Sequence, residues 1–245
     1  MFWKRERTTT IQLVSPSGSE ATSILHRMFR FNWNAWRNHP LEARRRTLEE
    51  VADFIQPQAS SIPSLNEQSA LYSLVGHDDD LMMVNFHDSV EDFNESRVRF
   101  AQTEFFSYLI PTNSYLSMEE LSQRELLATL HGRVPSRKYL CFYTMTGLPL
   151  TRTGLYYTPT ITDHRERMMH ALERMAQQHV AEIQQIVSGS IGLDGWEWAV
   201  DMFGDDPIIF KKVIYDLRFH ESHAIAATSA GASLGLRLDI HELES

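Results

Sequence analysis

The sequence predicts an α+β fold in which two ferredoxin-like halves pack sheet to sheet. Apolar strands alternate with amphipathic helices along the chain, and one strand-to-helix junction occurs twice. The segment FHD at 86–88, followed by Phe93, has the same spacing as FGD at 203–205, followed by Phe210. In both copies a strand ends in an aromatic residue, an aspartate caps the next helix, and a phenylalanine lies one turn in. This agreement indicates an internal duplication.

The boundary between the halves is expected near residues 130–136. We therefore assign residues 1–132 to an N-terminal ferredoxin-like half and residues 133–245 to a C-terminal half. A pair of sheets of this kind can enclose an apolar pocket, which is where a planar ligand would bind.

Three elements are predicted before the first junction. Apolar residues recur at helical spacing over residues 34–55 and predict one continuous helix. Residues 71–75 and 81–86 are rich in apolar and β-branched side chains and predict strands joined by the polar turn at 77–80.

Two capping patterns predict helix starts. Ser89 and Asp92 have the spacing of a capping box at the start of a long helix. The buried face of that helix is predicted to carry Val90, Phe93, Phe100 and Ala101. Ser117 and Glu120 have the same spacing and predict a short helix over residues 121–130.

In the second half, residues 185–219 contain most of the signals for secondary structure. Trp196, Glu197 and Trp198 predict a strand that follows a glycine-rich turn. Pro207 fits the first turn of the next helix, where its missing N–H costs nothing. The apolar face of that helix is predicted to comprise Ile209, Phe210, Val213, Ile214 and Leu217.

Composition narrows the classes of function. The chain has 245 residues, 42% of them hydrophobic, which is enough for a substantial core. A formal charge of -9 argues against a nucleic-acid-binding protein, and no apolar run is long enough for a membrane span. Cys141 is the single cysteine and lies in an apolar run, so it predicts a core residue in a reducing compartment, the cytoplasm.

Several segments together resemble one known family. They are residues 33–36 (WNAW), 71–74 (LYSL), 110–117 (IPTNSYLS), 141–145 (CFYTM) and the block 185–219. In this order they resemble the chlorite dismutase family, and most closely its coproheme decarboxylase branch. The resemblance implies the family's dimeric α+β barrel, a haem pocket in the C-terminal half, and a homo-oligomeric ring, commonly a pentamer.

The resemblance also implies a chemistry. The coproheme decarboxylases bind iron coproporphyrin III, peroxide oxidises the iron, and a tyrosine near a propionate carries the radical that starts decarboxylation towards haem b. Tyr143 matches that tyrosine, and a phenol suits the role because it can lose an electron and a proton together. Without the family, a tyrosine in an apolar strand is more often a core residue.

Further cofactor contacts are implied at three positions. Gln185 matches the neutral distal residue of the decarboxylases, where chlorite-degrading members carry an arginine whose charge would hold an anion. The alternative for Gln185 is an exposed residue on a strand. Arg133 matches a propionate-binding arginine if the loop to Tyr143 is shorter than usual, and Met145 lies in the matching segment.

The iron ligand is open between two histidines. Counting back from Gln185 without gaps puts Leu172 where the family has its histidine. His170 is nearest in sequence, but at about 100° per residue it points nearly opposite Leu172. His179 shares the apolar face with Leu172, two turns further on.

Other positions depart from the decarboxylase pattern. Asn113 replaces a propionate-contacting tyrosine, Gly147 a lysine, and His223 a propionate-binding serine. The sequence is therefore compatible with two alternative functions. One is a haem-dependent oxidoreductase that acts on a porphyrin with peroxide, and the other is a haem-free, non-catalytic paralogue that serves as a structural or partner-binding subunit.

Overall fold

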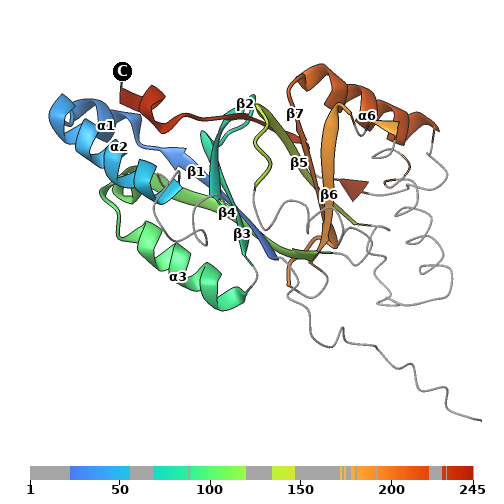
Figure 1. The fold of residues 1–245 in the computed structure, drawn as a ribbon, viewed down its shortest axis with the longest axis horizontal. Coiled ribbons are helices and arrows are strands. Elements are labelled where there is room, and N and C mark those ends of the chain that lie inside the picture. Colours follow the sequence, from blue (N-terminus) through green and yellow to red (C-terminus); the bar gives the residue numbers. More distant parts are fainter. Residues whose placement is uncertain are drawn as a thin grey trace, which may run out of the picture.

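A computed structural model gives the fold of most of the chain (Figure 1). It describes residues 23–55, 69–87, 89–119, 134–146, 172, 174, 178–179, 181–190, 193–220, 228–229 and 231–244.

Antiparallel strands close into a barrel at the centre of the molecule. Around the barrel the order is β7, β6, β4, β1, β3, β2, β9 and β5, and β5 pairs again with β7 to close the ring. The strands are β1 (Ser23–Phe31), β2 (Ser69–Val75), β3 (Leu81–His87), β4 (Leu109–Glu119), β5 (Tyr139–Thr146), β6 (Ile183–Gly189), β7 (Trp198–Gly204) and β9 (Ser233–Arg237). The short strand β8 (Thr228–Ser229) pairs with the end of β5. The predicted two-half α+β barrel is confirmed.

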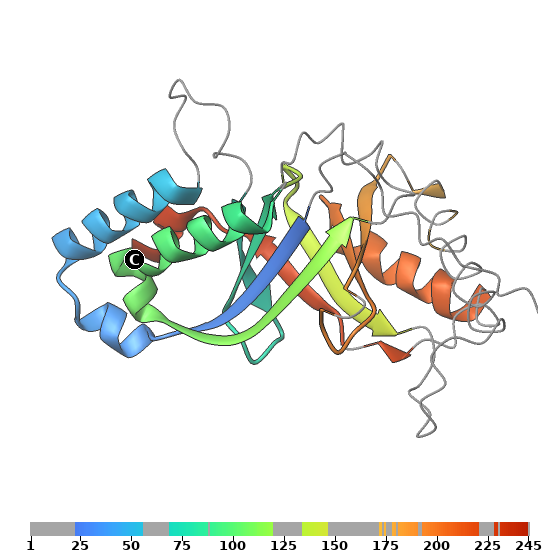
Figure 2. The same ribbon diagram turned by 90° about the horizontal axis from the view of Figure 1, so that it is seen from below.

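Helices cover the outside of the barrel. They are α1 (Trp33–Asn38), α2 (Leu41–Ile55), α3 (Val90–Ala101), α6 (Pro207–His220) and the 3-10 helices η1 (Glu104–Tyr108) and η3 (Ile240–Glu244). Figures 1 and 2 show α1, α2 and α3 at one end of the molecule and α6 at the other. None of the helices that the structure describes is both long and apolar enough to span a membrane.

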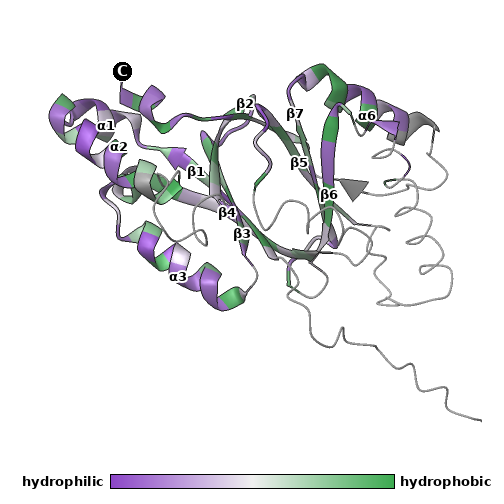
Figure 3. Cartoon of the chain, viewed as in Figure 1, coloured by the Kyte–Doolittle hydropathy of each residue, from purple (hydrophilic) through white to green (hydrophobic). Residues whose placement is uncertain are grey.

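Strand alternation divides the buried side chains into three cores. Side chains that point into the barrel form the first, including Tyr72, Phe86, Phe142 and Phe203. The second lies outside, between the barrel and α1, α2, η1 and η3. The third lies outside β5, β6 and β7, under α6. Figure 3 shows both hydrophilic and hydrophobic residues on the helices, as expected for elements with one buried face.

The repeated junction is confirmed except for its aspartate cap, because Asp206 rather than Asp205 accepts the hydrogen bond from the Ile208 N–H at the start of α6. Asp88 lies outside the described residues. Phe86 and Phe203 both point into the barrel at the ends of β3 and β7. Phe93 and Phe210 are both buried in the helices that follow. Ser89 caps α3 by accepting a hydrogen bond from the Asp92 backbone N–H at 3.1 Å, as the capping box predicts.

The predicted face of α3 is only half right. Phe93 and Phe100 are buried, but Val90 is 49% exposed and Ala101 is also exposed. Both lie at the ends of the helix, where the sheet no longer covers it.

The single helix predicted over residues 34–55 is wrong, because the chain breaks it into α1 and α2. The break is at His39, whose φ of -80° and ψ of 137° are extended. Pro40 follows it, and a proline ring clashes with a helical residue immediately before it.

The cap predicted at Ser117 is also wrong. Ser117 lies inside β4, fully buried, where its hydroxyl is 2.7 Å from that of Ser188 on β6. Its pairing with Ile24 on β1 continues the sheet through this point. The predicted helix at 121–130 lies outside the described residues.

The C-terminal segment joins the two halves. Strand β9 pairs with β2 on one side and with β5 on the other. Beyond it, Trp36 on α1 donates a hydrogen bond from Nε1 to the backbone oxygen of Leu243 at 2.8 Å. Arg45 on α2 forms a 2.5 Å ion pair with Glu244. The end of the second half therefore stabilises the helices of the first.

Candidate functional site

Register brings three of the predicted site residues to one face of the barrel. On β5, Tyr143 and Met145 point outwards, because the alternating residues Leu140 and Phe142 point into the barrel core. On β6, Gln185 lies between Ile183 and Val187, which also point outwards. The site residues of β5 and β6 therefore share the outer surface of the sheet.

Strand β7 lies between β5 and β6 and sets their spacing. Tyr143 is paired with Val200, and Val200 is paired in turn with Val187. Gln185 is paired with Met202 in the neighbouring row. Tyr143 and Gln185 are thus diagonal to one another, across one strand of apolar side chains.

The prediction of a pocket between the two sheets is wrong for the described residues, because the space between the sheets is packed with side chains. Large side chains fill the barrel, among them Tyr72, Phe86, Phe142 and Phe203. A strand that puts Phe142 into this core must point Tyr143 out of it. The site predicted from the sequence is therefore outside the barrel, between its wall and the covering segments.

The outer surface around Tyr143 and Gln185 is a continuous apolar layer. Tyr143 is 7% exposed, Met145 1% and Gln185 3%. The remaining members include Cys141, Leu172, Val187, Trp198, Val200, Met202, Ile209, Phe210 and Val213. The alternative expectation that Gln185 is an exposed residue is wrong.

Gln185 makes a specific contact with the segment that covers β6. Its side-chain Nε2 donates a hydrogen bond to the backbone oxygen of Leu172 at 3.2 Å. Leu172 is 1% exposed and packs into the same apolar layer. Gln185, which the sequence resemblance matches to the distal residue, thus contacts Leu172, which a gap-free count matches to the ligand position.

Of the two histidines predicted as iron ligands, His179 lies in the part of the chain that the structure describes. It is buried, as the helical spacing with Leu172 predicts, and its Nδ1 lies 3.0 Å from Glu182 Oε2. Its backbone oxygen accepts hydrogen bonds from the N–H groups of Glu182 and Ile183, both at 2.9 Å. His179 therefore sits at the turn that leads into β6. His170 and Arg133 lie outside the described residues.

The thiol of Cys141 lies beside the site, and its buried surroundings make it unreactive. Cys141 is buried on the outer face of β5, as the sequence predicts. Burial raises the pKa of the Cys141 thiol to about 12, with a smaller contribution from the carboxylate of Asp201. The side chain stays protonated at neutral pH and acts as a small apolar residue.

Two pairs of polar residues were not predicted from the sequence. His26 and Asp201 form a pair inside the barrel, with 2.8 Å between Nε2 and Oδ1. Arg27 and Arg97 approach each other under α3. The alternation in β1 signals that His26 points inwards, but nothing in the sequence signals its partner. Among the described residues no group of three or more His, Cys, Asp or Glu side chains could hold a metal ion.

Comparison with known proteins identifies the family. The family model described as chlorite dismutase matches residues 44–237. A haem-binding protein from Thermus thermophilus superposes with a TM-score of 0.71 and 27% identity, over 92% of this chain and 94% of that one.

Chlorite dismutase from Candidatus Nitrospira defluvii shares the fold at lower identity. Its complex with imidazole superposes with a TM-score of 0.67 and 16% identity, over 92% of this chain and 95% of that one. A single-residue variant of the same enzyme gives a TM-score of 0.66 and 15% identity, over 93% and 95%. With a family model that matches more than half of its residues and this shared barrel, the chain belongs to the chlorite dismutase family.

Proposed function

We propose that this protein binds an iron porphyrin, haem or iron coproporphyrin III, against the outer face of β5, β6 and β7 and uses it in oxidoreductase chemistry. The observation that carries the proposal is that Tyr143, Met145 and Gln185 share one buried apolar face. The relative from Thermus thermophilus, described as haem-binding, supports the same ligand class.

The wall of this site fits one face of a tetrapyrrole. Met145, Val187 and Val200 offer an apolar surface, and Gln185 offers a neutral hydrogen-bond donor within it. The opposite side requires a change, because Leu172 occupies the position next to the Gln185 amide. Porphyrin binding on this side therefore requires the hydrogen bond from Gln185 to Leu172 to break and Leu172 to move.

The specific reaction we propose is the oxidative decarboxylation of iron coproporphyrin III with peroxide. A bound iron porphyrin would supply the redox chemistry. Tyr143 would be the redox-active phenol, Gln185 and Met145 would contact the ring, and Arg133 would hold a propionate. His170 or His179 would bind the iron. The family resemblance further supports a homo-oligomeric ring, with a pentamer as the expected size.

Porphyrin titration tests the proposal directly. Purified protein mixed with iron coproporphyrin III should shift the Soret band of the porphyrin in a saturable way, and peroxide should then release carbon dioxide. His170→Ala and His179→Ala should identify the ligand, because one of them should shift or abolish the band. An unchanged porphyrin spectrum at micromolar protein would refute the proposal.

A second function, that of a haem-free structural subunit, is favoured by one contact. The 3.2 Å hydrogen bond from Gln185 Nε2 to the Leu172 backbone joins two positions that lie on opposite sides of the porphyrin in the family. Leucine at position 172 also cannot bind iron. A paralogue that lost its cofactor would be expected to fill the space with such a contact.

One substitution separates the two functions. If the protein is haem-free, the wild type leaves the Soret band of added iron porphyrin unshifted, while Leu172→His places an imidazole at the ligand position and should shift it. If the protein binds haem through His170 or His179, the wild type already shifts the band. Leu172→Met serves as the matched control, because methionine conserves the volume without adding a nitrogen ligand.

A further inference from the structure

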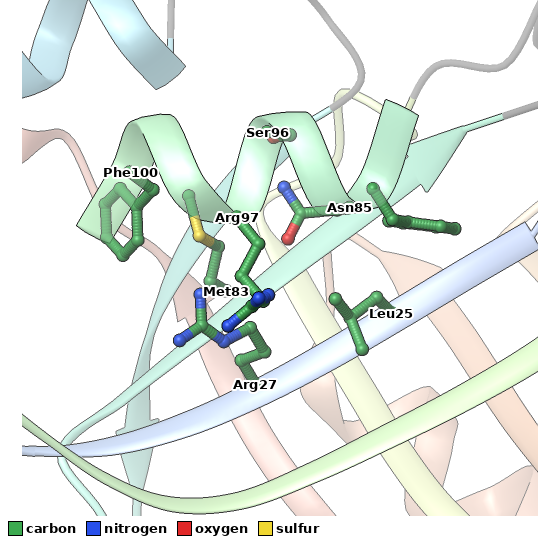
Figure 4. Close-up of a pocket in the computed structure, with 8 residues that line it drawn as sticks. Leu25, Arg27, Met83, Asn85, Ser96, Arg97 and Phe100 are labelled. Carbon is green, nitrogen blue, oxygen red and sulfur yellow. The ribbon is translucent and has the colours of Figure 1, made fainter. Parts of the chain in front are cut away.

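A small hollow lies in the N-terminal half, far in the sequence from the proposed porphyrin site. It is lined by residues of β1, β3 and α3 and is partly open to solvent, and its enclosed part has room for about one water molecule. Its polar side chains are Arg27, Asn85, Ser96 and Arg97. Figure 4 shows the side chains of Arg27 and Arg97 extending towards one another below α3.

Arg27 is fixed in this hollow by aromatic rings. Its guanidinium carbon lies 5.0 Å from the ring centre of Phe29, 6.0 Å from that of Phe100 and 5.7 Å from that of Phe106. Contacts of this kind hold the cation in place without neutralising it. Burial, and then the charge of Arg97, lower the pKa of Arg27 from its usual value.

Among the described residues, the two arginines have no acidic partner. Arg97 donates a hydrogen bond from Nη2 to the side-chain oxygen of Asn94 at 3.2 Å, which is a neutral partner. Within the part of the chain that the structure describes, neither Arg27 nor Arg97 forms an ion pair with a carboxylate. Arg27 is partly buried and Arg97 is exposed. Like charges that face each other repel, and an anion between them offsets this repulsion.

The lining fits an oxoanion. Guanidinium groups donate parallel N–H hydrogen bonds to phosphate and carboxylate oxygens, and Ser96 can add a hydroxyl donor. Phe93 and Phe100 also line the hollow, and because its enclosed part holds only about one water molecule, the anion would bind at the open side, where Arg97 is exposed. We propose that the hollow between β1, β3 and α3 binds a small oxoanion, a phosphate or a short carboxylate, between Arg27 and Arg97.

Phosphate titration tests this site. Full-length protein in a phosphate-free buffer should bind inorganic phosphate at a single saturable site, seen by calorimetry at constant ionic strength, and its thermal midpoint should rise with phosphate. A parallel titration with acetate tells whether a carboxylate suffices. Chloride at the same ionic strength should give neither effect.

Variants on α3 supply a matched comparison. Arg97→Gln should weaken phosphate binding by about tenfold or more, and Arg27→Gln should do the same. Arg99→Gln changes the same charge on the same helix, but Arg99 lies over Phe54 rather than in the hollow, so binding should be retained.

Two results would overturn the proposal. One is a wild type that shows no saturation at millimolar phosphate or acetate. The other is an equal loss of binding in Arg97→Gln and Arg99→Gln, which would mean that the general positive charge of the helix attracts the anion. Neither result depends on the porphyrin, so the outcome is independent of the proposed function.

Discussion

His26 on β1 and Asp201 on β7 meet inside the barrel, with 2.8 Å between His26 Nε2 and Asp201 Oδ1. The two strands belong to different halves and are not neighbours in the sheet. The His26 ring also stacks on Phe142 of β5, with ring centres 4.0 Å apart. The pair is therefore a polar link across an otherwise apolar core.

Removing one partner of this pair should be costly. Asp201 is fully buried, so His26→Leu leaves a carboxylate without its partner inside the barrel. We expect a loss of about 3 to 5 kcal/mol in the free energy of unfolding, measured by urea denaturation. The double variant His26→Leu, Asp201→Leu should recover most of it, because an apolar pair of similar volume needs no compensation. Strictly additive losses would show that the two residues do not interact.

Much of the barrel was predictable because its strands follow local patterns. The apolar and β-branched residues at 81–86 predict the strand β3. The cap at Ser89 and the turn before β3 depend on a few neighbouring residues, and local chemistry decides them. The duplication made the second junction predictable from the first.

Most of the wrong predictions have the same cause, which is contact between segments that are distant in the sequence. Ser117 has the local signature of a helix cap, but pairing with β1 and the hydroxyl of Ser188 keep it in a strand. Which face of β5 meets the core depends on how the barrel closes, and closure requires β2 to pair with β9 and β4 with β6, strands from different halves. The approach of Arg27 to Arg97 likewise arises only when α3 packs on the sheet. His39 is the exception, since Pro40 already signalled the break.

Close packing between β9 and β2 predicts an effect at Gly235. A Cβ atom added there would lie 2.8 Å from the Cβ of Tyr72, which is fully buried. Gly235→Ala should therefore lower the free energy of unfolding by about 1 to 3 kcal/mol. Gly231→Ala is the control, because nothing lies within 4 Å of its added Cβ. A thermal midpoint for Gly235→Ala equal to that of the control would contradict the close contact.

The raised pKa of Cys141 predicts slow thiol chemistry. With a pKa of about 12, the folded protein at pH 8 holds far less thiolate than a free cysteine. Reaction with a disulfide reagent should be slower than in the urea-unfolded chain by roughly 10³-fold or more, and should accelerate only at strongly alkaline pH. Absorbance of the released thiol measures both rates. Rapid labelling of the folded protein would show that Cys141 is accessible and ionised.

Asp205 predicts an acid-dependent contribution to stability. The backbone N–H of Lys138 and the guanidinium of Arg137, 3.1 and 2.6 Å away, lower the pKa of the Asp205 carboxyl in the folded state. A carboxyl whose pKa is lower when folded adds stability above its ordinary pKa and loses it as the pH falls through the lowered value. Asp205→Asn should thus lower the thermal midpoint slightly at pH 7, and the difference should shrink towards pH 3.

A turn aspartate gives the matched control for Asp205. Asp78 is exposed, and among the described residues it forms no ion pair or hydrogen bond. Asp78→Asn should leave the thermal midpoint nearly unchanged at both pH values. A similar midpoint shift in the two variants would assign the effect to net charge rather than to the contact with Arg137 and Lys138.

Tyr143 gives the sharpest test of the proposed chemistry, because binding and reaction can be measured separately. The residue is buried on the outer face of β5, and Tyr143→Phe removes only its hydroxyl. If its phenol is redox-active, the variant should keep the porphyrin spectrum and lose peroxide-dependent release of carbon dioxide by about 100-fold or more. Tyr139 lies on the same face of the same strand and is only partly buried, so Tyr139→Phe should keep the activity. Equal activity in both variants would remove Tyr143 from the reaction even if the porphyrin binds.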